Sequence, residues 1–215
     1  MSPPAIALSA DPAADLAAMR ARVQGRNINP DSLLATDYLN HFNEVIMLLG
    51  MVPDMPECLD DAKAWQPKDY AQHFRDSGFT DKELAIAAYE LSPAEFREPF
   101  DRTIALMDEL VARGIRQIEL CLDRSEALAA TVRMLSQKLQ LLMDVATASI
   151  NGRNATMGQA EIDQIMGAFD GHGTEIAPAA DTAPAGNQDA IDALFDDAPA
   201  KPAGSAQDAI DALFA

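Results

Sequence analysis

The sequence predicts an all-α protein: a helical bundle with one very long C-terminal helix, followed by a disordered acidic tail with short docking helices. Alanine and leucine are abundant, while aromatic residues make up only 6% of the 215 residues. This composition favours helices packed on helices. Apolar residues also recur at helical spacing as far as residue 151. From Gly171 onward Ala, Pro, Gly and Asp dominate, a composition that buries too little apolar surface to offset the entropy of ordering.

The elements are assigned in chain order from start and stop signals. Residues 1–10 are expected to be a disordered start, and residues 11–155 the bundle domain. Gly25 ends the first helix, and Pro30 suits the first turn of the second, where its missing N–H costs nothing. The expected helices cover residues 11–24, 31–50, 56–65, 67–77, 81–91 and 93–151.

Two sequence signals of helix starts precede the last two helices. TDKE at 80–83 and SPAE at 92–95 have the spacing of capping boxes. In such a box a Ser or Thr side chain accepts from the backbone three residues on, and the Glu side chain reaches back. These signals predict that Thr80 and Ser92 cap the helices that follow.

The helix expected at 93–151 carries a seven-residue apolar pattern. Its a positions are Ile104, Val111, Ile118, Ser125, Val132, Leu139 and Ala146. Its d positions are Met107, Gly114, Cys121, Leu128, Leu135, Leu142 and Ser149. Its e positions add Ile115, Leu122, Ala129, Met143 and Ile150, which makes the stripe wider than a two-stranded seam requires.

This wide stripe predicts a multi-helix bundle, closed either within the chain or by a homodimer. At about 1.5 Å per residue the helix would approach 90 Å, too long for the earlier helices to cover. The alternative is a helix that breaks near Gly114 and packs locally. Cys58 and Cys121 fall inside apolar helical patterns and are expected to be buried thiols.

The charge distribution restricts the class of partner. The net charge is −18, and residues 158–215 hold eleven acidic residues and one basic residue, Lys201. Nucleic acids and anionic membranes should repel such a chain, whereas a protein with a basic groove should attract it. No apolar run approaches the roughly 20 residues of a membrane span, and the start lacks the basic region of a signal peptide. We therefore expect a cytoplasmic protein.

The tail, residues 156–215, contains three segments that align without gaps: 158–166, 187–195 and 206–214. Gln, Ile and Asp recur at identical offsets, and a bulky apolar pair closes each segment. These positions are Gln159, Ile162, Asp163, Ile165 and Met166; Gln188, Ile191, Asp192, Leu194 and Phe195; and Gln207, Ile210, Asp211, Leu213 and Phe214. The separations of 29 and 19 residues exclude a solenoid, which needs a fixed period.

Each repeat predicts a short amphipathic helix, because its Ile and its apolar pair fall on one helical face. A helix of this length is not stable alone in water. It should therefore fold in the hydrophobic groove of a partner, guided by its acidic flanks, and three copies should raise the effective concentration. The alternative is that some copies fold back on the bundle and cap it.

The repeats resemble a known short motif. QAEID at 159–163, and QDAIDALF at 188–195 and 207–214, are similar to the N-terminal peptide of the flagellar motor switch protein FliM and the C-terminal peptide of the chemotaxis phosphatase CheZ. In those families the peptide is an amphipathic helix that docks on the phosphorylated response regulator CheY. The resemblance implies a CheY-like receiver domain as the partner, held by the apolar residues of each repeat.

The resemblance to CheZ extends to the layout of a helical bundle, a Pro/Ala linker and a terminal peptide. The family's FQDxTGQ motif, which serves phosphatase chemistry, is absent. Gln140 and Asp144 are the nearest polar pair, and their four-residue spacing places them on one helical face, where they can position a water. The alternative is that Gln140 and Asp144 simply belong to a solvent-exposed helix face without a catalytic role.

No cofactor and no metal site are expected. His41 and Glu44, and likewise Asp69 and His73, lie one turn apart, but neither pair has the Glu-x-x-His order of di-iron bundles. Three functions stay open: a chemotaxis or flagellar-switch protein that binds a receiver domain, a divergent CheZ-like phosphatase, and a structural helical oligomer whose tail peptides cap its own bundle.

Overall fold

The computed structural model describes residues 11–153 and 157–167, and all regular elements within them are helical, which confirms the all-α class. In chain order these are α1 (Pro12–Val23), η1 (Thr36–Leu39), α2 (Asn40–Met51), α3 (Cys58–Ala64), α4 (Tyr70–Asp76), α5 (Lys82–Glu90), α6 (Ala94–Glu119), α7 (Ser125–Ile150) and α8 (Gln159–Gly167). Among these helices none is both long and apolar enough to cross a membrane. The disordered start predicted at residues 1–10, and residues 168–215 of the tail predicted at 156–215, lie outside the described residues.

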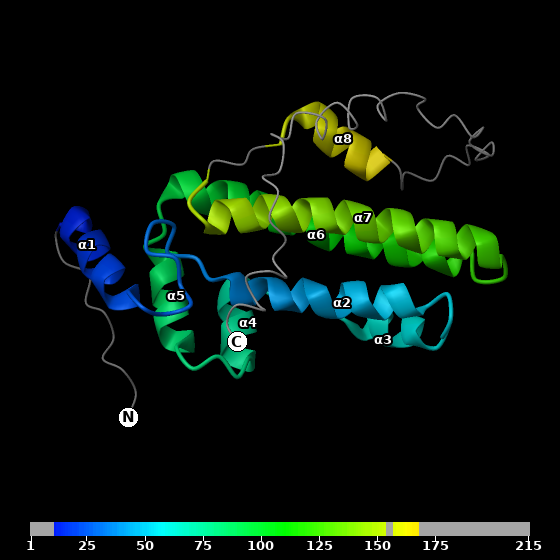
Figure 1. The fold of residues 1–215 in the computed structure, drawn as a ribbon, viewed down its shortest axis with the longest axis horizontal. Helices are drawn as coiled ribbons and strands as arrows, with labels where there is room; N and C mark the ends of the chain where they lie inside the picture. Colours follow the sequence, from blue (N-terminus) through cyan, green and yellow to red (C-terminus); the bar gives the residue numbers. More distant parts are fainter. Residues whose placement is uncertain (1–10, 154–156, 168–215) are drawn as a thin grey trace, which may run out of the picture. The chain divides into compact units, whose positions relative to one another are not determined.

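The single long helix predicted at 93–151 is wrong, because the chain folds back in its middle. Helix α6 ends at Glu119, and α7 returns antiparallel to it after a short turn (Figure 1). In that turn the Arg124 side chain donates to the Leu120 carbonyl at 3.1 Å, which satisfies one free acceptor at the end of α6. Folding back lets the two halves of the apolar stripe bury each other within one chain.

The residues of the predicted stripe do form the core of this hairpin. Met107, Val111 and Ile118 on α6 are at most 1% exposed. On α7, Leu135 and Leu142 are fully buried. Most of the stripe is therefore buried as predicted, although it belongs to two helices, and Leu122 and Ser125 beside the hairpin turn are exposed. The described contacts close it within the chain, and a homodimer stays a prediction.

The earlier helices form a second layer on this hairpin. Helix α2 runs along α7, while α3 contacts both α2 and α6 (Figure 1). An ion pair of 2.6 Å between Lys63 and Glu119 joins α3 to the end of α6. Helices α4 and α5 pack on each other, and α1 packs on α5. The largest fully buried aromatic side chains are those of Tyr38, Phe42, Phe74 and Phe100.

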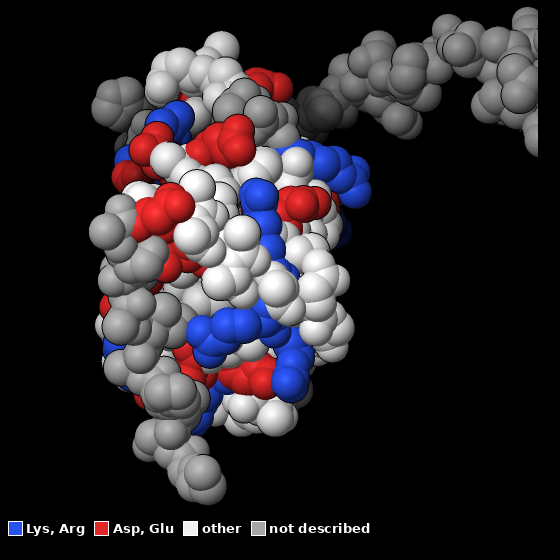
Figure 2. Space-filling view, turned by 90° about the vertical axis from the view of Figure 1, so that its left-hand side faces the viewer, with Lys and Arg blue, Asp and Glu red and all other residues white. Residues whose placement is uncertain are grey.

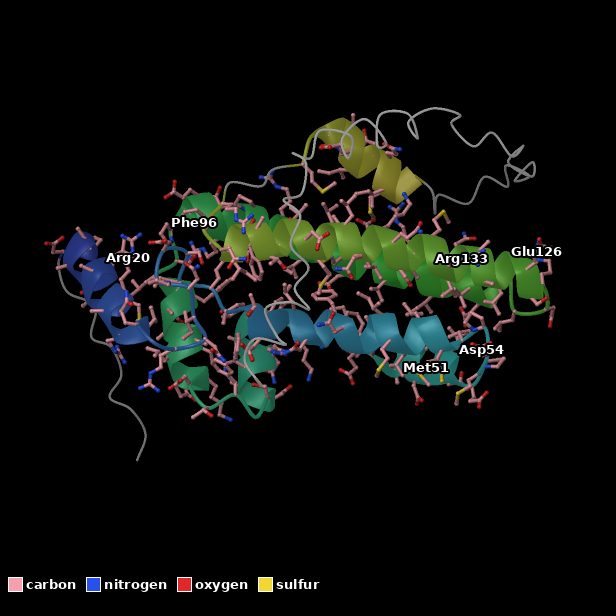
Figure 3. All side chains as sticks on the ribbon, viewed as in Figure 1. Arg20, Met51, Asp54, Phe96, Glu126 and Arg133 are labelled. Atoms are coloured by element: carbon pink, nitrogen blue, oxygen red, sulfur yellow. The ribbon has the colours of Figure 1, made fainter. Side chains whose placement is uncertain are left out.

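The turns at one end of this layered body expose apolar side chains. Figure 3 shows Met51 at the end of α2, Asp54 in the turn from α2 to α3, and Glu126 in the first turn of α7. Met51 is 36% exposed, and Leu120 in the hairpin turn is 69% exposed. The buried cysteines agree with expectation, since Cys58 and Cys121 are free thiols with at most 8% exposure.

The helix predicted at 31–50 begins later than expected, because residues 30–35 form an irregular buried loop. The Asn29 side chain accepts from the backbone N–H groups of Asp31 and Ser32 at 2.8 and 3.1 Å, which offers this segment an alternative to helix. Leu33 adopts a left-handed φ of 61°, and its side chain is fully buried. Tertiary burial of this leucine therefore overrides the helical spacing.

The two predicted capping boxes mark the right places but do not form. Helix α5 has Asp81 as its N-terminal flanking residue with no side-chain cap, and Asp81 instead pairs with Arg26 at 3.0 Å. Before α6, the Ser92 hydroxyl donates to the Ser32 carbonyl at 2.7 Å. In both cases a side chain near the helix start serves a long-range contact.

Candidate docking site

The first repeat of the tail forms helix α8. At its start the Glu161 side chain accepts from the Gly158 backbone N–H at 2.8 Å, one half of a capping box. One turn on, the Gln159 amide donates to the Asp163 carboxylate at 2.8 Å. Gln159 and Asp163 are both exposed, so within this copy they stabilise the helix itself. The same four-residue Gln–Asp spacing recurs in the other two copies.

The opposite face of α8 is apolar and packs against the hairpin. Ile165 and Met166 are 5% and 8% exposed, although they lie in a nine-residue helix at the edge of the bundle. Ile162 and Met157 are half-buried against the same core. Figure 1 shows α8 lying on the side of α7 that faces away from α2. The predicted anchor residues of the first repeat therefore contact this chain's own bundle.

We call the surface that receives α8 the α7 face and define it by Met134, Lys138, Leu141 and Val145. The Lys138 ammonium donates to the Gln164 carbonyl at 3.0 Å, near the C-terminal end of α8 where carbonyls lack helical partners. Partial burial lowers the pKa of Lys138. A positive charge at this end of α8 is favourable because the helix dipole is negative there.

The fit between α8 and the α7 face is incomplete. A cavity of about 550 Å³ separates part of the two helices. It is lined by Met134, Gln137, Lys138, Leu141, Val145, Met157, Glu161, Gln164 and Ile165. Leu141 remains 48% exposed although it points at this groove. The α7 face thus has apolar surface that the first repeat does not cover.

No protein-family model, curated protein or solved structure matches this chain significantly. The assignment of a function therefore depends on the geometry and the tail repeats.

The remaining predicted site residues divide into two groups. Those of the second and third repeats lie outside the described residues. Gln140 and Asp144 both lie exposed on α7, beside the strip that holds α8, with 3.5 Å between the Gln140 amide nitrogen and a carboxylate oxygen of Asp144. They share a helical face, as their four-residue spacing predicts.

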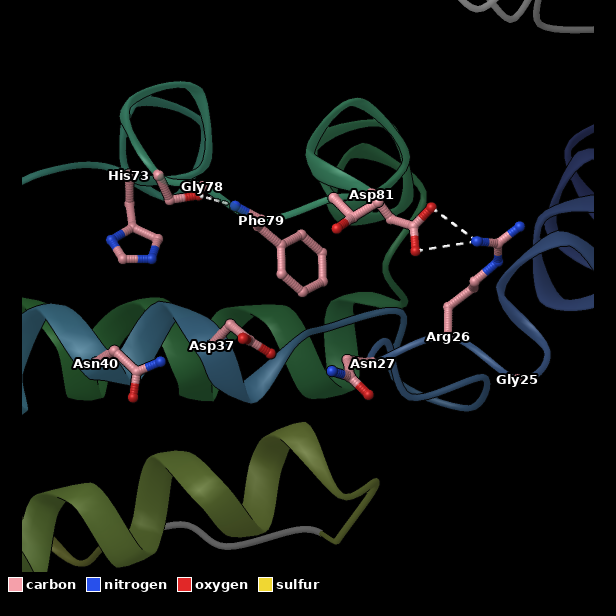
Figure 4. A pocket seen from close by; sticks show the side chains of 11 residues that line it. Gly25, Arg26, Asn27, Asp37, Asn40, His73, Gly78, Phe79 and Asp81 are labelled. Carbon is pink, nitrogen blue, oxygen red and sulfur yellow. Dashed lines mark hydrogen bonds and ion pairs between the residues drawn. The ribbon is translucent and has the colours of Figure 1, made fainter.

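A second concavity, which sequence reasoning missed, lies between α4, α5 and the loop after α1 (Figure 4). It has a volume of about 660 Å³ and is lined mainly by polar groups. The ion pair of Arg26 with Asp81 crosses one side, with carboxylate distances of 3.0 and 3.2 Å. Burial lowers the pKa of His73, which also faces this space. Because its residues come from three separate segments of the chain, no local sequence pattern predicts this cavity.

A third concavity of about 290 Å³ has an aromatic and acidic lining that includes Tyr38, Tyr89 and Asp108. The Tyr89 hydroxyl donates to Asp101 at 2.9 Å. One carboxylate oxygen of Asp108 is buried without a hydrogen-bond partner, and desolvation raises the pKa of this group to about 6. The charged form of this carboxylate therefore costs stability.

Of the histidines considered for a metal site, His41 is buried and packs within the core. His41 stacks on Trp65 with ring centroids 4.5 Å apart and hydrogen bonds the Gln66 carbonyl at 2.9 Å. Across the described ranges, 11–153 and 157–167, no three metal-ligating side chains gather.

Figure 2 shows basic and acidic side chains interspersed over one end of the molecule. The face in that view offers no broad surface of a single charge.

Proposed function

We propose that this chain is a cytoplasmic binding protein of the chemotaxis or flagellar-switch type that docks a CheY-like response regulator through its repeated tail peptides. The observation that supports it best is α8. In this copy the repeat adopts a helix whose Ile165 and Met166 enter an apolar surface, while Gln159 and Asp163 stay outside. This is the helix-in-groove mode that the resemblance of the repeats implies.

The second and third repeats are better anchors than the first. They replace the Ile–Met pair by Leu194–Phe195 and Leu213–Phe214. A buried Phe brings a larger apolar area than Met and a rigid ring that loses less conformational entropy on binding. Several weak binding peptides in one chain raise the overall affinity for a partner, provided that the partner presents more than one groove.

A labelled peptide of residues 204–215 tests the proposal by fluorescence anisotropy against the receiver domains of the source organism. We expect binding to one of them, several-fold tighter when that domain is phosphorylated. Ile210→Asp and Phe214→Asp should each abolish the signal, because each places a charge in an apolar groove. Gln207→Ala is the matched control and should weaken binding less than about three-fold, since it removes one helix-stabilising bond. Absence of binding to every receiver domain would contradict the proposal.

The packing of α8 favours a second candidate, a structural protein whose tail peptide caps its own bundle. Burial of Ile165 and Met166 is a stabilising contact within the chain. If capping is the function, the full chain with Ile165→Asp should lose several degrees in Tm. If docking is the function, the same change should leave the cooperative transition of the bundle nearly unchanged.

A further inference from the structure

We infer that the α7 face is a binding site for the repeated sequence itself, and that the third repeat, residues 206–214, is an occupant that replaces α8 on it. The face already holds one copy of the repeat. This inference does not depend on binding of a receiver domain. It concerns a second binding site for the same peptide, on this chain itself.

Three of the contacts that hold α8 have counterparts in the third repeat. Lys138 binds a backbone carbonyl, which every residue at the offset of Gln164 supplies. The Gln159–Asp163 bond has its counterpart in Gln207 and Asp211. The apolar anchors of the third repeat, Ile210, Leu213 and Phe214, fall at the offsets of Ile162, Ile165 and Met166. The packing of Met157 and the bond between Glu161 and the Gly158 N–H belong to the first copy alone, since the third repeat has Ser205 and Ala209 at the offsets of Met157 and Glu161.

The third repeat should fit the α7 face better than α8 does. Two of the α8 residues that border the open cavity are Glu161 and Gln164. The third repeat has Ala209 and Ala212 at these offsets. Smaller, uncharged side chains at the edge of the contact let a helix approach α7 more closely and cover Leu141, which α8 leaves 48% exposed.

The chain is long enough for this exchange. Between Gly167 and Ala206 lie 38 residues. Extended backbone spans up to about 3.3 Å per residue, whereas α7 at about 1.5 Å per residue is about 40 Å long. The consequence is competition, since a repeat held on the α7 face cannot offer its apolar anchors to another protein.

The test uses the full chain and a labelled peptide of residues 204–215. Ile191→Asp and Ile210→Asp are placed in the chain first, so that its own later repeats do not compete. In this background we compare α8 intact with α8 displaced by Ile165→Asp. Displacing a tethered competitor should tighten peptide binding about ten-fold or more. Ile162→Asp, at a half-buried anchor, provides a second displacement variant, and circular dichroism confirms that each bundle is folded.

Leu141→Asp tests the site on the displaced background. Leu141 is half-exposed, so the change should leave the fold intact while it abolishes peptide binding. Leu120→Asp, at a leucine that is 69% exposed in the hairpin turn, is the matched control and should leave binding unchanged.

Three results would overturn the inference: no peptide binding to the displaced variants, equal affinity with α8 in place, or binding that survives Leu141→Asp. No receiver domain is present in this assay. Its failure therefore leaves the proposed function standing, and failure of the receiver assay leaves this site standing.

Discussion

Leu135 on α7 occupies the space that a side chain at Gly114 on α6 would need. A Cβ atom built on Gly114 would overlap both terminal methyl carbons of Leu135. Both residues are buried; Gly114 lies in the last quarter of α6, and Leu135 lies near the middle of α7. The missing side chain therefore allows the two helices to approach, and Gly114 is a packing position in an unbroken helix, not the break that the sequence had suggested.

Gly114→Ala should destabilise the protein by about 1–3 kcal/mol, the usual cost of overpacking a core. The inserted methyl forces Leu135 out of its rotamer or separates the helices. Urea unfolding followed by circular dichroism measures the effect. In the double variant with Leu135→Ala the total loss should be smaller than the sum of the two single losses, because the alanine at 135 removes the methyl groups that the new Cβ would overlap.

Gly50→Ala is the matched control for this prediction. Gly50 lies in α2, and a Cβ atom at this position would meet nothing within 4 Å. The substitution should stabilise the protein by about 0.5–1 kcal/mol through helix propensity alone. A similar destabilisation at both glycines would show that steric contact with Leu135 is not the cause.

Ser32 ties the irregular loop after α1 to the end of the hairpin. Its hydroxyl donates to the Ile150 carbonyl, and its own carbonyl accepts from Ser92. Ser32→Ala should cost about 1–3 kcal/mol, since it leaves a buried acceptor unpaired at the C-terminus of α7. Ser136→Ala, at a half-buried position on α7, should change the unfolding free energy by less than about 0.5 kcal/mol.

The sequence predicts the fold class and the buried stripe, because both depend on local composition and spacing. Ile104, Leu128 and Leu139 are buried where the seven-residue pattern places them. The pattern cannot distinguish a helix that continues from one that folds back, since both present the same stripe. The turn after Glu119 has no Gly or Pro to mark it. Its position is set by the packing of α6 on α7.

Prediction of the candidate site is similarly divided. The repeat itself is visible from sequence, and the residues of its first copy fold as the expected helix. The surface that receives this copy is not visible, because Met134, Lys138, Leu141 and Val145 become a docking face only through their position on the outside of the hairpin. The polar cavity of Figure 4 brings together Arg26 and Asp81, which are 55 residues apart, and cannot be predicted from the sequence for the same reason.

The Gln159–Asp163 hydrogen bond should help to hold α8 in its helical form. Asp163→Ala removes it and should weaken α8 by about 0.2–0.5 kcal/mol, the typical value for such a pair. Amide hydrogen exchange should then speed up within α8 by less than about three-fold, with no change in α6 or α7. A uniform increase over all helices would mean that the bond supports the whole bundle.

Asp108 should make the protein less stable at neutral pH than in mild acid. Its pKa is raised from 3.8 to about 6 by desolvation. The folded state therefore holds a proton that the unfolded state has released between about pH 4 and pH 6, and stability falls as pH rises through this window. Above about pH 6 the destabilisation by the charged Asp108 is complete and no longer changes with pH.

Asp108→Asn isolates this contribution, because the neutral amide has a similar shape and carries no charge. The burial of His41 and His73 lowers the pKa of each, so protonation of these groups destabilises the protein as pH falls and opposes the Asp108 effect in the parent. The difference in unfolding free energy between variant and parent therefore excludes the contribution of the two histidines. Because Asp108 keeps some contact with water, we expect a gain of about 1 kcal/mol at pH 7.5, or about 2–4 °C in Tm. The gain should disappear at pH 4, and an equal gain at both pH values would contradict a charge-based cause.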